Sequence, residues 1–156
     1  YAILGEMVAV AVGQTYQEAC SARVLDPAGI HSAQVSRSMG GTLAWGGWAM
    51  SVRDYAKFHS YWFGPDGPYG NGAPEVLRLD LGGGAFYGLG MFEREWNGSR
   101  NFWHFGSCVI PFWVNAGTFA VMWRGEWSAV VSYDVCVDEE AKAKLERALA
   151  RAAFAR

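Results

Sequence analysis

Apolar residues recur at helical spacing in three segments of the first half of the chain. Residues 2–12 are apolar on nearly every side and stop at Gly13, a usual helix terminator. Residues 16–24 end shortly before Pro27, which disfavours helical geometry in the residue before it. Residues 52–63 repeat aromatic and aliphatic side chains every three or four positions. We predict three helices, the first of them buried because it has no polar face.

The apolar spacing changes toward a period of two in the second half. This alternation predicts four antiparallel strands, over residues 87–96, 100–105, 114–123 and 127–135. The first two flank Asn97 and Gly98, the preferred pair for a two-residue type I′ turn. Residues 138–154 are acidic at the start, basic toward the end and apolar on one face, which predicts a helix across the sheet. Residues 64–84 contain three prolines and are predicted as loop.

These elements predict one unit of the α+β class, in which helices flank an antiparallel sheet. Residues 1–84 should form a mainly helical lobe with loops, and residues 85–156 the sheet strands and a C-terminal helix. No internal repeat and no low-complexity linker divides the sequence. We therefore expect all of these elements to belong to a single domain.

The composition narrows the class of partner. Of the 156 residues, 51% are apolar, which is the balance of a globular domain. The net charge is −2 and there is no basic run, so nucleic acid and anionic membranes are disfavoured. The first apolar stretch is too short to span a bilayer, which needs about 20 residues. Eight Trp, seven Tyr, nine Phe and 20 Gly suit strands, tight turns and a cleft lined by rings, so we expect a small or apolar ligand.

The familiar local signatures of catalysis are absent from the sequence. It contains neither G-x-S-x-G nor S-x-x-K, so no complete serine-nucleophile motif is present. H-E-x-x-H and a Walker loop are also absent, and the three cysteines lie far apart, so we expect neither a metal nor a cofactor. Residues 1–156 thus carry no self-sufficient catalytic set.

A histidine at the end of a predicted strand is the best local candidate for chemistry. The segment Trp103-His104-Phe105-Gly106-Ser107 would place an imidazole and a free backbone N–H at the edge of a cleft. Those groups stabilise an oxyanion. The same residues also fit a half-buried strand histidine followed by a turn, and the local sequence does not separate the two. His59 and His31 are expected to be structural or solvated, and Cys108 a small buried hydrophobe.

The order of six short segments is more specific than any one of them. The segments are YAILG (1–5), GQTY (13–16), LDPAGI (25–30), GGWAMSVRD (46–54), YGLG (87–90) and HFGS (104–107). In this order they resemble the second half of the serine β-lactamase-like, or penicillin-binding, family. That family includes class C β-lactamases, D-alanyl-D-alanine carboxypeptidases and related esterases. The resemblance covers almost the whole chain.

The resemblance implies a penicillin-binding fold, in which an antiparallel sheet and a helical lobe enclose the active site. It implies acyl transfer through a serine ester, with the Ser-x-x-Lys and Tyr-x-Asn motifs upstream of Tyr1. Residues 1–156 would then be the C-terminal portion of one domain, incomplete at the N-terminus and inactive alone. We expect association with an N-terminal part, from the same gene or a second chain, or self-association. Tyr69-Gly70-Asn71 spells the tyrosine motif, but it lies in a predicted loop and is interpreted as coincidence.

In the resemblance, the last segment supplies the catalytic-site residues of this chain. His104 matches the Lys or His that faces the site, Gly106 the glycine that admits substrate, and Ser107 the residue whose backbone N–H joins the oxyanion hole. Phe105 departs from the usual Thr or Ser and has no hydroxyl for a substrate carboxylate, which disfavours β-lactams and D-alanyl-D-alanine. An apolar substrate-binding wall is expected instead from Trp103, Phe105, Phe112 and Trp113. Packing within the sheet is an equal alternative for each of these rings.

The expected function is that of a serine hydrolase that acts on a small-molecule ester or amide through an acyl-enzyme. The alternative is a non-catalytic relative of the family, or an aromatic-rich module that binds sugar or peptide. The two hypotheses differ in whether a nucleophilic serine accompanies residues 1–156 in the functional protein.

Overall fold

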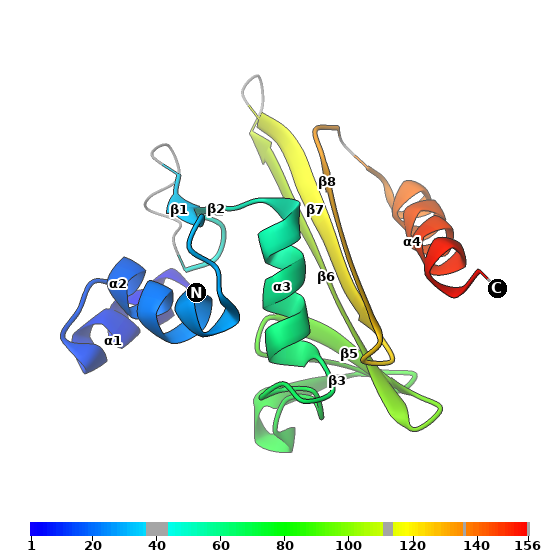
Figure 1. The fold of residues 1–156 in the computed structure, drawn as a ribbon, viewed down its shortest axis with the longest axis horizontal. Helices are drawn as coiled ribbons and strands as arrows, with labels where there is room; N and C mark the ends of the chain where they lie inside the picture. The colour runs from blue at the N-terminus through cyan, green and yellow to red at the C-terminus, as the bar shows by residue number, and fades with distance from the viewer. Residues whose placement is uncertain (37–43, 111–113, 136, 156) are drawn as a thin grey trace.

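A six-stranded antiparallel sheet forms the centre of the molecule. The computed structural model describes residues 1–36, 44–110, 114–135 and 137–155 (Figure 1). The sheet strands follow one another in sequence order. They are β3 (Arg78–Gly82), β4 (Ala85–Gly88), β5 (Met91–Trp96), β6 (Ser99–Ile110), β7 (Val114–Trp123) and β8 (Trp127–Tyr133). The predicted α+β class and the antiparallel sheet are confirmed.

Helices lie on both sides of this sheet. The α-helices of the described residues are α1 (Ala2–Val12), α2 (Tyr16–Cys20), α3 (Val52–Phe63) and α4 (Glu139–Phe154). Figure 1 shows α3 along one side of the long strands and α4 along the other, with α1 and α2 beyond α3. A short two-stranded sheet, β1 (Gln34–Val35) with β2 (Trp48–Ala49), lies on the α1 and α2 side. The predicted position of the C-terminal helix against the sheet is confirmed.

Side-chain caps set where three of these helices begin. Thr15 opens α2 with a reciprocal capping box. Ser51 Oγ accepts a hydrogen bond from the Asp54 N–H at the start of α3 (3.1 Å), and Asp138 Oδ1 caps α4 in the same way (2.7 Å). α1 and α3 keep their predicted bounds. The predicted second helix is too long, because a π-helical turn over Ser21–Leu25 follows α2.

The sheet contains two more strands than the sequence analysis predicted. The predicted loop over 64–84 is wrong at its end, because β3 lies there and pairs antiparallel with β4. The single strand predicted over 87–96 is divided into β4 and β5 by a turn at Leu89 and Gly90, whose φ angles are 52° and 81°. Positive φ at consecutive residues reverses an extended chain sharply, and the apolar residues on both sides concealed this turn.

The predicted hairpin between β5 and β6 is confirmed. Asn97 and Gly98 both have positive φ, 50° and 76°, as a type I′ turn requires. Arg124 and Gly125 adopt positive φ of 54° and 68° in the turn between β7 and β8. These two turns lie at the same end of the sheet, because β6 and β7 run antiparallel between them.

Two apolar cores lie on opposite faces of the sheet. Between the sheet and α3 lie Phe63, Met91, Phe102 and Met122, with Phe58, Trp62 and Tyr69 around them. Between the sheet and α4 lie Phe119, Val121 and Trp123, surrounded by side chains of β6, β8 and α4. Side chains alternate along a strand, so the even-numbered residues of β6 near Phe102 face α3 and their odd-numbered neighbours face α4. This alternation decides which candidate residues can share a site.

The first helix is not buried, contrary to the prediction. Gly5 is its one buried residue, and a Cβ at this position would lie 2.8 Å from the Ala44 Cβ. Ile3 and Val10 are 77% and 82% exposed. The helix is apolar on all sides, but α2 and the segment around Ala44 cover only a small part of it. Within the described residues, no helix combines the length and the apolarity needed to cross a membrane.

Candidate functional site

The strand that carries the candidate histidine has strand partners on both sides only over its first part. β5 pairs with β6 as far as Phe92↔Trp103. β7 continues to pair with β6 as far as Ile110. From His104 onward, β6 therefore has a strand on the β7 side and, among the described pairings, none on the other. This open edge coincides with the segment selected from the sequence.

The backbone of Gly106 shows which groups point to the open edge. The Tyr133 O–H donates a hydrogen bond to the Gly106 carbonyl oxygen (3.4 Å), and a Cβ on Gly117 of β7 would lie 2.6 Å from the same oxygen. The Gly106 carbonyl therefore points toward β7. Backbone groups of consecutive strand residues point to alternate sides, so the N–H groups of Phe105 and Ser107 point toward the open edge. Ser107 is exposed, and an outward N–H at an exposed position is what an oxyanion donor requires.

A side chain at position 106 would crowd the neighbouring strand. A Cβ built on Gly106 would lie 3.1 Å from Thr118 Oγ1, tighter than ordinary van der Waals contact. The glycine keeps this part of the α3 face flat next to the open edge. A substrate chain could approach the strand closely there, which is the role predicted for Gly106.

His104 lies on the α3 face and is half-buried. Its Nδ1 is buried and has no hydrogen-bond partner among the described residues. Burial lowers the pKa of the imidazole below its ordinary value, and hydrogen bonding with the backbone of Gly90 partly offsets that effect. The ring is therefore mainly neutral at pH 7. A neutral imidazole with a free ring nitrogen can accept or donate a hydrogen bond.

A second histidine faces this region from α3. His59 is completely buried, and neither of its ring nitrogens has a partner in the part of the chain that the structure describes. Its ring is enclosed by Tyr55 and Phe63, with centroids 5.1 and 5.7 Å away. Burial lowers the pKa of His59 to about 4, and the nearby charge of His104 lowers it further. His59 is thus structural rather than solvated, and its proximity to His104 was not predicted.

The aromatic residues expected to form a substrate wall are separated from His104 by the sheet. Trp103 stacks on Phe92 (centroids 5.6 Å apart) and Phe105 stacks on Phe119 (4.2 Å), on the face that α4 covers. Lys142 Nζ of α4 lies 5.3 Å from the Phe105 ring centroid. For these two rings the structure shows sheet packing, the alternative that the sequence left open.

Three of the residues discussed from the sequence cannot be placed. Phe112 and Trp113 lie outside the described residues, as does the side chain of Cys108. His31 is exposed, with Nδ1 at 3.3 Å from Asp26 Oδ1, in agreement with the prediction of a solvated histidine. Among the described residues, no group of three or more His, Cys, Asp or Glu side chains has the arrangement of a metal site.

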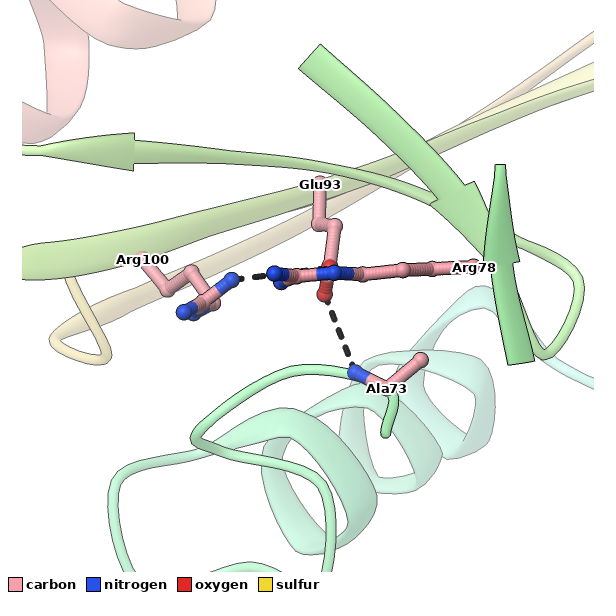
Figure 2. Close-up of polar contacts among 4 residues, drawn as sticks. All are labelled: Ala73, Arg78, Glu93 and Arg100. Atoms are coloured by element: carbon pink, nitrogen blue, oxygen red, sulfur yellow. Dashed lines mark hydrogen bonds and ion pairs between the residues drawn. The ribbon is translucent and has the colours of Figure 1, made fainter. Parts of the chain in front are cut away.

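A buried ionic cluster lies on the same face of the sheet, toward the β5–β6 hairpin. Glu93 is only 2% exposed, and its Oε1 lies 3.3 Å from Arg78 Nη1 and 3.5 Å from Arg100 Nη1. Its Oε2 accepts a hydrogen bond from the Ala73 N–H (3.1 Å). Figure 2 shows the two guanidinium groups approaching the same carboxylate. The sequence analysis missed this cluster because it depends on β3, which was predicted as loop.

Comparison of the chain with protein-family models, with curated proteins and with solved structures found no match. The relation to the β-lactamase-like family therefore rests on the six sequence segments alone.

Proposed function

We propose that residues 1–156 form the C-terminal part of a serine hydrolase of the β-lactamase-like type, acting on a small ester or amide through an acyl-enzyme. The observation that carries the proposal is the open edge of β6, toward which the Ser107 N–H points. His104 and Gly106 lie on the adjacent α3 face. These residues match the last of the six sequence segments, and the antiparallel sheet with helices on both sides agrees with the expected architecture.

In this proposal the chain contributes binding and electrostatic stabilisation, while the nucleophile lies upstream. The Ser107 N–H would be one of two donors to the oxyanion of the tetrahedral intermediate. A single donor of this kind lowers the barrier by about 3 to 4 kcal/mol in a serine hydrolase. The proposed Ser, Lys and Tyr supply the attack and the proton transfers, so residues 1–156 alone should not turn over substrate.

His104 would hold the leaving group or the proton-transfer network by hydrogen bonding. Its unpartnered Nδ1 and its lowered pKa favour a neutral ring at pH 7, which can donate through one nitrogen and accept through the other. A neutral histidine makes a weaker anion partner than a lysine in the same place. This difference favours substrates without a carboxylate beside the scissile bond.

The position of Phe105 supports the same substrate preference. The ring is packed against Phe119 on the α4 face and provides no hydroxyl at the open edge. Recognition of a β-lactam or D-alanyl-D-alanine carboxylate through this position is therefore disfavoured. Uncharged esters and amides are the better candidates.

Labelling with a fluorophosphonate tests the proposal directly. We expect no labelled serine in residues 1–156 alone, and one labelled serine upstream when the natural coding sequence is expressed in full. An uncharged p-nitrophenyl ester should be hydrolysed only by the longer polypeptide. A labelled serine within residues 1–156, or a full-length polypeptide that neither labels nor hydrolyses esters, would overturn the proposal.

A binding module is the second candidate, because several tryptophan rings are exposed. Trp45, Trp96 and Trp127 are 61%, 52% and 49% exposed. Exposed aromatic rings provide stacking surfaces for sugars and peptides. Saturable quenching or a shift of tryptophan fluorescence with an oligosaccharide, in a full-length protein that does not label with fluorophosphonate, would favour this candidate.

A further inference from the structure

A cavity of about 350 Å³ lies at the hairpin end of the sheet. It is enclosed by the β5–β6 hairpin, the β7–β8 turn and the loop that follows α3. The residues that matter for its chemistry are Phe63, Pro65, Asn71, Glu95, Ser99 and Arg100. Its volume is at the lower end of the range for small-ligand sites, roughly 300 to 1,000 Å³. The cavity is on the α3 face, and its lining includes none of the proposed active-site residues.

Two opposite charges line this cavity without pairing with each other. Glu95 and Arg100 are direct partners in the β5–β6 register. The Arg100 guanidinium nevertheless turns to Glu93, with Nη1 at 3.5 Å from Oε1, as Figure 2 shows. In the described part of the chain, Glu95 has no ion pair within 4.0 Å. The cavity therefore has a carboxylate on one side and a guanidinium on the other.

The guanidinium side carries an uncompensated positive charge. Glu93 supplies one negative charge to both Arg78 and Arg100, and Arg78 Cζ also lies 4.3 Å from the Phe86 ring centroid. The side chain of Arg100 is 21% exposed. A guanidinium has five N–H donors, and the interaction with Glu93 uses Nη1 alone. The remaining donors can take a second carboxylate in a fork-shaped pair of hydrogen bonds.

The rest of the lining is mixed in character. Phe63 and Pro65 present apolar surface, and Asn71 and Ser99 present polar groups. The Ser99 O–H donates to the Trp96 carbonyl oxygen (3.2 Å). An apolar surface beside two separated opposite charges matches a molecule that has both charges at one end and a hydrocarbon group at the other.

We infer that this cavity binds a free α-amino acid with an apolar side chain, in its zwitterionic form. The carboxylate would bind to Arg100, the ammonium group to Glu95, and the side chain would lie against Phe63 and Pro65. A simple anion is disfavoured because Glu95 repels it, and a simple amine because the Arg78 and Arg100 charges repel it. The inference is independent of the proposed hydrolase activity.

Titration of the protein with three matched ligands tests this inference. L-leucine carries both charges, 4-methylpentanoate lacks the ammonium group, and 3-methylbutylamine lacks the carboxylate. Amide chemical shifts of Asn71, Gly98 and Ser99 should change saturably with L-leucine. Each singly charged analogue should bind at least about tenfold more weakly, because a hydrogen bond to a charged group is lost. Equal binding of either analogue, or no shift at these residues with L-leucine, would overturn the inference.

A pair of variants separates the cavity from general surface effects. Glu95→Gln should weaken L-leucine at least about tenfold and leave 4-methylpentanoate unchanged or bound more tightly. Glu146→Gln removes an exposed carboxylate on α4, outside the cavity lining, and should leave both affinities unchanged. Glu95 is exposed, so its substitution should not affect folding. A Glu95→Gln protein that binds L-leucine as well as wild type would contradict the inference.

Discussion

The Tyr133 hydroxyl of β8 reaches across β7 and donates a hydrogen bond to the Gly106 carbonyl oxygen of β6, 3.4 Å away. Gly117 makes this contact possible, because a Cβ there would lie 2.3 Å from the Tyr133 ring. The hydrogen bond fixes the direction of the Gly106 carbonyl and thereby the outward direction of the Ser107 N–H. The proposed oxyanion donor thus depends on a glycine and a tyrosine in two other strands.

Substitution of Gly117 by alanine should destabilise the sheet at this point. The new Cβ would lie 2.3 Å from the ring and 2.6 Å from the Gly106 oxygen, so the strands must move apart. We expect a loss of about 2 kcal/mol in the free energy of unfolding, measured with urea. Tyr133→Phe keeps the ring and removes only the hydroxyl, so it should cost about 1 kcal/mol or less. Equal stabilities of Gly117→Ala and wild type would show that the ring is not held over this glycine.

The buried His59 should make the stability depend on pH in the acidic range. Its folded pKa of about 4 lies below its ordinary value of 6.5, so the unfolded chain binds the proton more readily. Stability should be complete above about pH 6.5 and fall between about pH 6.5 and pH 4, by roughly 3 kcal/mol. Urea midpoints across this range would measure the loss.

His59→Phe should flatten that profile, because the replacement ring does not titrate and leaves no unpaired nitrogen. The lowered pKa of His104 contributes a smaller slope of the same sign, which this variant retains. His31→Gln removes an exposed histidine and should leave the profile unchanged. If His59→Phe keeps the full acidic loss, carboxylate groups and not His59 cause it.

Neutralisation of Glu93 should strongly destabilise the fold. Glu93→Gln preserves an acceptor for the Ala73 N–H but leaves the Arg78 and Arg100 guanidinium groups without a counter-charge. Removal of one partner from a buried ionic cluster costs about 3 kcal/mol. Glu126→Gln changes an exposed carboxylate in the β7–β8 turn and should stay within about 0.5 kcal/mol of wild type. Indistinguishable urea midpoints for the two variants would mean that solvent already neutralises the cluster.

The exposed face of α1 should cause residues 1–156 to self-associate. Ile3, Met7 and Val10 lie along one side of the helix and are 77%, 61% and 82% exposed. Sedimentation velocity should show species larger than a monomer, and the dye ANS should bind. Ile3→Lys combined with Val10→Lys should reduce both signals, whereas Gln17→Lys on α2 should not. A monomeric wild-type chain that binds no ANS would contradict this expectation.

Local sequence signals predicted the elements whose determinants lie within a few residues of one another. The Asn97-Gly98 turn, the Ser51 cap and the amphipathic spacing of residues 138–154 each combine side chains that are neighbours in sequence. The missed strand β3 lies between proline-rich and glycine-rich segments, whose loop signals outweighed it. Its pairing with β4 provides backbone hydrogen bonds that no local propensity encodes.

Only the tertiary structure brings together the groups of the candidate sites. His59 and His104 are 45 positions apart, and Glu93 meets Arg78 and Arg100 from two other strands. The separation of Trp103 and Phe105 from His104 follows from the alternation of side chains, once α3 and α4 have taken opposite faces. The sequence by itself determined the α+β class, three of the four long helices and hairpin strands around Asn97-Gly98, and the identity of the candidate segment 103–107. Which faces are covered, which edge stays open and which charges meet depended on long-range register, because those contacts form only when distant strands pair.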